Sequence, residues 1–122
     1  MIPSEARIFH VDDSETARRK VAEAANRIGA TVVASAASFE EARAGLAEIK
    51  ALGINVVLTD ENLSTVTPYE GRFVFDIVRA EHPGVHVLSV SGSARMSQDL
   101  GIPHISDKGT DSAALEAAIE AL

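Results

Sequence analysis

The chain contains no cysteine and no tryptophan, and its 122 residues include only one tyrosine. Without cysteine it can form neither a disulfide framework nor a thiol redox centre, which is consistent with a reducing compartment. Positive charge is also scarce, because 11 Lys and Arg stand against 18 Asp and Glu, giving a net charge of −7. Nucleic-acid binding draws much of its affinity from Lys and Arg, and single strands also need aromatic rings for stacking. We therefore expect no direct binding to nucleic acid.

Long apolar runs are missing as well. No stretch approaches the roughly 20 apolar residues that span a membrane, and the opening MIPSEARIF lacks the charged and then apolar layout of a signal peptide. We therefore expect a cytoplasmic protein with no membrane association. A hydrophobic content of 46% suffices for a buried core, and 122 residues correspond to one ordinary domain, 1–122, without an output domain.

Short β-branched runs alternate with helical patterns along the chain, which is typical of βαβ units and a parallel sheet. Strands are expected at 7–11, 31–36, 55–59, 85–90 and about 104–106. Helices are expected at about 14–28, 38–52 and 71–80, with a short segment at 94–100 and a final helix from 112. The apolar run at 55–59 lacks alternation, which indicates a central strand covered on both faces.

Local signals mark several helix ends. Ser14 is a candidate N-cap, and Ser38 and Glu41 have the spacing of a capping box. Gly29 and Gly53 stand where the first two helical patterns stop.

Acidic residues stand where successive strands end. Asp12 and Asp13 follow the first strand, and Asp60 follows the third. Neighbouring strands of a parallel sheet open onto one crevice at their carboxyl ends, so these carboxylates should converge. Carboxylates gathered so closely either take up protons or bind a hard cation such as Mg²⁺. The pattern predicts a divalent-cation site, whereas a helix opening at Ser14 would account for only one acid of the adjacent pair.

Two later strand ends add groups suited to phosphoryl chemistry. Ser91 and Gly92 offer a hydroxyl and an unobstructed backbone, and Lys108 offers an ammonium. With Asp60 as a carboxylate nucleophile and a metal beside it, each part has a task in phosphoryl transfer. Each feature alone is common, since a polar strand end or a solvated lysine needs no special role.

This ordered set resembles the receiver domains of two-component response regulators, the CheY-like family. The residues that carry the resemblance, spread over nearly the whole chain, are Asp12-Asp13 followed by SETARRK, Asp60-Glu61-Asn62, Ser91-Gly92 and Lys108. The resemblance implies an α/β flavodoxin-like fold, a doubly wound sheet of five parallel strands in the order 2-1-3-4-5.

The resemblance also implies roles for individual residues. Asp60 would be the phosphoacceptor, and Mg²⁺, with Mn²⁺ as a substitute, would be held by Asp12, Asp13, Asp60 and the backbone carbonyl of Asn62. 

Further residues would act on the phosphoryl group. Ser91 and Lys108 would contact it, while Asn62 and Ser93 would tune its lifetime. The partners would be a histidine kinase or histidine phosphotransfer protein and an unknown downstream protein. Such a stand-alone receiver is mainly a switch that catalyses its own phosphorylation and dephosphorylation.

The chain departs from the family pattern in four places. Gly109 follows Lys108 where a proline is usual, and Ile105 replaces an aromatic residue of the family's switch. The stretch 91–101 is short, so the fourth helix should be stunted or irregular, and the loop at 63–68 is longer than usual.

Three alternatives stay open from the sequence. One is a pseudo-receiver, a binding module that works without phosphorylation, and another is a small Mg²⁺-dependent phosphatase, for which 122 residues leave little room. A transition-metal centre is the third, but the histidines show no close ligand pair, which favours core, turn or surface roles. These histidines are His10, His82, His86 and His104.

Overall fold

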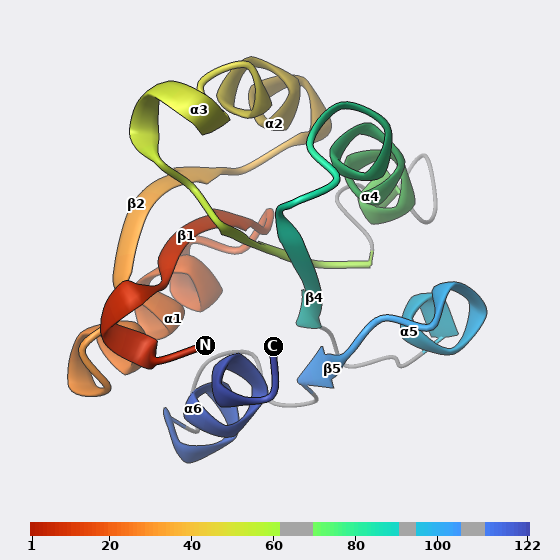
Figure 1. The fold of residues 1–122 in the computed structure, drawn as a ribbon. Coiled ribbons are helices and arrows are strands. Elements are labelled where there is room, and N and C mark those ends of the chain that lie inside the picture. The colour runs from red at the N-terminus through yellow and green to blue at the C-terminus, as the bar shows by residue number, and fades with distance from the viewer. Residues whose placement is uncertain (62–69, 91–94, 106–111) are drawn as a thin grey trace.

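The computed structural model describes residues 1–61, 70–90, 95–105 and 112–122. Five parallel strands form one sheet in the order β2-β1-β3-β4-β5 (Figure 1). They are β1 (Arg7–Val11), β2 (Thr31–Ala36), β3 (Val56–Thr59), β4 (His86–Val90) and β5 (His104–Ile105). The predicted fold class and strand order are therefore confirmed.

Helices cover both faces of the sheet. They are a 3₁₀ turn η1 (Pro3–Glu5), α1 (Glu15–Arg27), α2 (Phe39–Leu46), α3 (Ile49–Leu52), α4 (Glu70–Glu81), α5 (Arg95–Leu100) and α6 (Ser112–Glu120). Figure 1 shows α1 and α6 on one face and α2, α3 and α4 on the other, with α5 beside the edge strand β5. In the part of the chain that the structure describes, no helix is long and apolar enough to cross a membrane.

Alternate residues along the strands pack into two separate hydrophobic cores, one on each face of the sheet. Ile8 and Leu58 join the core under α1 and α6, whereas Phe9, Val11 and Val57 join the core under α2, α3 and α4. All four residues of β3 are buried, as expected for the central strand of a doubly covered sheet. The sheet is thus fixed from both sides, which sets the positions of its strand ends.

The predicted helix caps are present. The Ser14 hydroxyl accepts a hydrogen bond from the Ala17 backbone at 3.1 Å, and the Ser38 hydroxyl accepts one from Glu41 at 3.2 Å. The Glu41 carboxylate returns to the backbone N–H of Ala37, one residue before the cap, at 2.8 Å.

The prediction of a single helix over 38–52 is wrong in one respect, because this segment forms two helices, α2 and α3. Between them the Glu48 N–H bonds to the Gly45 carbonyl at 2.9 Å, an i→i−3 contact that tightens the chain into a turn. Glycine at position 45 weakens the helix here, and it is required because a Cβ would lie 2.1 Å from the buried Phe9 ring. The fourth helix of the prediction, the short segment expected at 94–100, is confirmed: it is α5, which has six residues.

Candidate metal and phosphoryl site

The carboxyl ends of β1 and β3 lie side by side. Val11 pairs with Thr59 in the parallel register, so the residues that follow, Asp12 and Asp60, leave the sheet together. The Asp60 N–H bonds to the Val11 carbonyl at 2.9 Å, which extends the ladder by one step and fixes the backbone of Asp60. The sheet register therefore brings acids 48 residues apart in sequence to one place.

Asp12, Asp13 and Asp60 form one acidic group. Each offers a carboxylate oxygen, and the three oxygens lie within 4.8 Å of one another. Asp12 and Asp60 are buried, at 0% and 4% exposed, while Asp13 is exposed. The group therefore opens to solvent on the side of Asp13.

Asp12 is held on several sides. One carboxylate oxygen accepts a hydrogen bond from the Ser14 N–H at 2.9 Å, and the Arg18 guanidinium donates to the Asp12 backbone carbonyl at 2.6 Å. The other carboxylate oxygen lies 3.8 Å from Nε2 of His10, which is also fully buried. The first turn of α1 thus orients Asp12, and His10 has the core role expected from the sequence.

The arrangement fits a hard divalent cation. Mg²⁺ binds oxygen ligands at about 2.1 Å, so two ligands on opposite sides of the ion are roughly 4.2 Å apart. The oxygens of Asp12, Asp13 and Asp60 occupy a region of similar size. Carboxylates this close repel one another when charged, and a bound dication offsets that repulsion.

Other predicted site residues lie outside the described residues. These are Asn62, Ser91, Ser93 and Lys108. In sequence, Asn62 follows Glu61, and Ser91 follows the last residue of β4. Ile105, which stands where the family has an aromatic residue, lies within the described residues. Its side chain is 4% exposed and belongs to the core under α1 and α6.

Sequence reasoning missed the burial of Glu61. Its side chain is fully buried, and neither carboxylate oxygen has a hydrogen-bond partner in the part of the chain that the structure describes. The first turn of α4 packs on the backbone of Asp60 and Glu61, and the Gly71 N–H donates to the Glu61 carbonyl at 3.1 Å. A Cβ at Gly71 would lie 2.0 Å from the Asp60 carbonyl oxygen. A glycine inside a helical pattern is the sequence signal for such a close approach.

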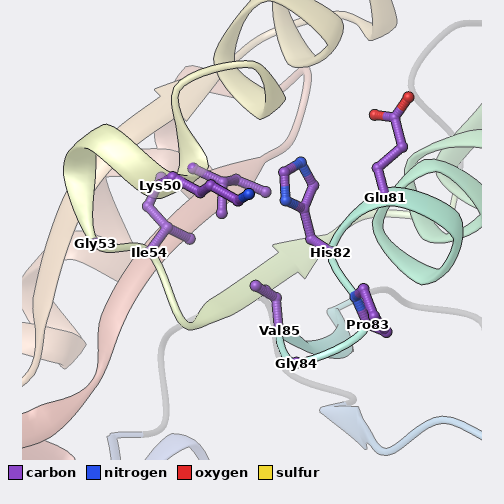
Figure 2. A pocket seen from close by; sticks show the side chains of 9 residues that line it. Lys50, Gly53, Ile54, Glu81, His82, Pro83, Gly84 and Val85 are labelled. Carbon is purple, nitrogen blue, oxygen red and sulfur yellow. The ribbon is translucent and has the colours of Figure 1, made fainter.

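A hollow of about 430 Å³ lies at the opposite end of the sheet and has a different character. Figure 2 shows that Lys50, from α3, and His82, after the end of α4, line it together with the turn into β4. Glu81 is the one acid among the residues that line it. This hollow therefore lacks the convergent acids of the group at Asp60.

Similarity to known proteins appears in structure and not in sequence. No family sequence model matches the chain, and no curated protein sequence matches it. A chain of the CheX-CheY-BeF₃-Mg²⁺ complex from Borrelia burgdorferi superimposes with a TM-score of 0.78 at 17% identity, covering 99% of this chain and 97% of that one. A CheY-like receiver domain from Methanospirillum hungatei gives 0.71 at 23% identity, covering 95% and 91%.

A longer protein matches over part of its length. The RcsB response regulator from Salmonella typhimurium gives a TM-score of 0.74 at 16% identity over 95% of this chain, which spans 58% of the RcsB chain. Identities this low establish the fold alone. The chain has the CheY-like receiver fold, with an acidic group at the carboxyl ends of β1 and β3.

Proposed function

We propose that this chain is a response-regulator receiver that accepts a phosphoryl group on Asp60 in a Mg²⁺-dependent reaction. The donor is a histidine kinase or a histidine phosphotransfer protein, and the phosphorylated chain signals through contact with another protein. The observation that carries the proposal is the group formed by Asp12, Asp13 and Asp60 at adjoining strand ends of a receiver fold.

The reaction follows from the chemistry of these groups. A carboxylate oxygen of Asp60 attacks the phosphorus of a phosphohistidine, a P–O bond forms, and the P–N bond breaks. The imidazole leaves with the electron pair and takes up a proton, and Asp60 becomes an acyl phosphate. The backbone bond from Asp60 to Val11 and the buried strand β3 hold the nucleophile in place during the attack.

The neighbouring residues supply charge balance. Asp12, Asp13 and Asp60, with the backbone carbonyl of Asn62, are the proposed ligands of Mg²⁺, which when bound neutralises charge on the transferred phosphoryl oxygens. The hydrogen bond from the Ser14 N–H fixes the orientation of the Asp12 carboxylate. Ser91 and Lys108 are proposed to contact the phosphoryl oxygens, and Ser93 to influence the lifetime of the acyl phosphate.

The test is incubation with Mg²⁺ and a small acyl phosphate donor such as acetyl phosphate, read by intact mass. We expect one phosphoryl adduct that hydroxylamine removes, that chelation of Mg²⁺ suppresses, and that Asp60→Asn abolishes. Asp76→Asn is the matched control, because it makes the same change at an exposed position on α4. An adduct that persists in Asp60→Asn would refute the assignment of the nucleophile.

The other functions give different results in the same experiment. A folded protein that forms no adduct with the small donor, or with phosphorylated histidine kinases, would indicate a pseudo-receiver. Sustained release of phosphate from many unrelated phosphate esters would indicate a phosphatase. BeF₃⁻, described as phosphomimetic in a structure of the RcsB receiver domain, provides a second probe with Mg²⁺.

A further inference from the structure

A groove runs between α2 and α4, on the face of the sheet opposite α1 and α6 (Figure 1). Each helix contributes residues spaced four apart, which lie on one side of a helix. We call the following six residues the α2–α4 groove: Phe39 and Arg43 from α2, Ala47 at its C-cap, and Phe73, Ile77 and Glu81 from α4. Five of them, all except Phe73, line a hollow of about 360 Å³, with the buried Leu46 also in its wall.

The groove begins with an exposed aromatic pair. Phe73 is 45% exposed and is one of two large hydrophobic side chains classed as exposed among the described residues, the other being Ile2. The rings of Phe39 and Phe73 lie 5.6 Å apart between centroids and are tilted by 59°, a favourable geometry for an aromatic pair. Aromatic residues and Arg are enriched at protein interfaces, and a pair already in contact loses little conformational freedom on binding.

The groove also carries charges of both signs. Arg43 and Glu81 are exposed and line the same hollow. Of the arginines in the described segments, only Arg27 forms an ion pair with a carboxylate, that of Glu23. Glu81 likewise forms no ion pair within the described residues, so Arg43 and Glu81 both remain available to a partner.

We propose that the α2–α4 groove is an interface between two copies of this chain related by a two-fold axis. In an isologous interface both copies use the same patch, so a residue i of one copy contacts a residue j of the other, and j of the first contacts i of the second. Such a patch must therefore complement itself. The groove meets this requirement: Arg43 of one copy faces Glu81 of the other, and the apolar residues between them cover one another. 

The charges favour a second copy over a partner that carries charge of one sign only. A purely acidic segment would attract Arg43 but would be repelled by Glu81, and a purely basic segment would have the opposite difficulty. The patch itself supplies both signs together with aromatic rings. The proposal is independent of phosphorylation, because none of the acids at the strand ends belongs to the groove.

Charge exchange tests the interface directly. Molar mass is measured by sedimentation equilibrium over a range of concentrations for the unmodified chain, Arg43→Glu, Glu81→Arg and an equimolar mixture of the two variants. The unmodified chain should form a dimer, and each variant alone should dissociate at least about tenfold more readily, because like charges then meet twice. In the mixture, each new charge faces its opposite and the unchanged Arg43 and Glu81 also meet, so the mixed dimer should form.

Further variants separate the apolar and charged parts. Phe73→Ser should weaken the dimer, while Ile2→Ser, at the other exposed hydrophobic residue, should leave it unchanged. Arg79→Glu, an exposed arginine of α4 outside the groove, controls for the change in net charge. Circular dichroism on each variant confirms that it is folded.

Each result decides the question. A dimer in the unmodified chain that both reversals disrupt and their mixture restores would establish the interface. A monomer at every concentration would overturn the proposal, and so would a dimer that the reversals leave intact. Two monomeric variants whose mixture stays monomeric would overturn the pairing of Arg43 with Glu81 and hence the two-fold arrangement.

Discussion

The carboxyl and amino ends of the sheet differ in the burial of their polar side chains. All six buried polar side chains of the described residues belong to the carboxyl ends of β1, β3 and β4 or the residues that directly follow them. They are His10, Asp12, Thr59, Asp60, Glu61 and Ser89. Burial of charged groups is costly unless they are paired or bind a cation, so this end of the sheet carries a cost that the fold alone does not require.

The amino end of the sheet is fastened by exposed hydrogen bonds. The Asn55 side chain accepts from the Arg7 N–H and donates to the Glu5 carbonyl, both at 2.8 Å. The Arg7 side chain donates to the Leu52 carbonyl at 2.9 Å, next to Gly53, whose positive φ of 65° closes α3. Here every polar side chain named bonds to backbone, and among the described residues no group of acids converges at this end.

This difference separates the scaffold from the proposed site. The amino end and the two cores hold the strands in register, and the register then forces acids together at the carboxyl end. Changes at the amino end should therefore alter stability without altering cation binding, while changes at the carboxyl end should alter cation binding.

The largest effect is expected from Asp12→Asn combined with Asp13→Asn. Affinity for Mg²⁺, measured by calorimetric titration, should fall at least about a hundredfold, because two anionic ligands are lost. The metal-free variant should be at least as stable to urea, since like-charge repulsion is relieved and an Asn oxygen can still accept from the Ser14 N–H. 

A control variant carries the same charge change elsewhere. Asp76→Asn combined with Asp99→Asn alters two exposed acids on α4 and α5 and should retain Mg²⁺ binding. Normal Mg²⁺ affinity in the variant of Asp12 and Asp13 would mean that these acids serve only to open α1.

Strand positions could be predicted because the parallel sheet imposes a strong pattern. The buried run at 56–59 and the caps at Ser14 and Ser38 are local signals, and local chemistry determines them. Convergence of the acids at Asp12 and Asp60 requires β1 and β3 to be neighbours, and that strand order came from the resemblance to receiver domains and not from the strand pattern itself. These features therefore depend on rules that act within a few residues or on the topology of βαβ units.

Other features depend on contacts between distant residues and were not predictable. The break between α2 and α3 reflects the approach of Gly45 to Phe9 on β1, which no local propensity records. The burial of Glu61 depends on how α4 packs against the strand end. Likewise, Phe73 is exposed while Val74 is buried, which depends on the face that α4 turns to the sheet.

A smaller effect, on stability, is expected from Gly71→Ala. The new Cβ would lie 2.0 Å from the Asp60 carbonyl oxygen, which is backbone and cannot move aside without shifting α4 or the strand end. Overpacking of this kind costs about 1–3 kcal/mol, partly offset by the better helix propensity of alanine. We expect a loss of about 2 kcal/mol in urea unfolding, together with weaker Mg²⁺ binding. Gly84→Ala, where a Cβ meets nothing within 4 Å, should be neutral or slightly stabilising.

The smallest effect is expected from Asn55→Ala at the amino end. Two hydrogen bonds of the Asn55 side chain are lost, but water can replace them because both are exposed. The cost should be about 1 kcal/mol in urea unfolding, near the net value of one ordinary hydrogen bond. Asn26→Ala, an exposed asparagine of α1, is the matched control and should change stability by less than about 0.5 kcal/mol. Mg²⁺ affinity should be unchanged in both variants, because the strands keep their register through the buried ladders of β1 and β3. A fall in Mg²⁺ affinity in Asn55→Ala alone would show that the two ends are coupled, and the separation of scaffold from site would have to be given up.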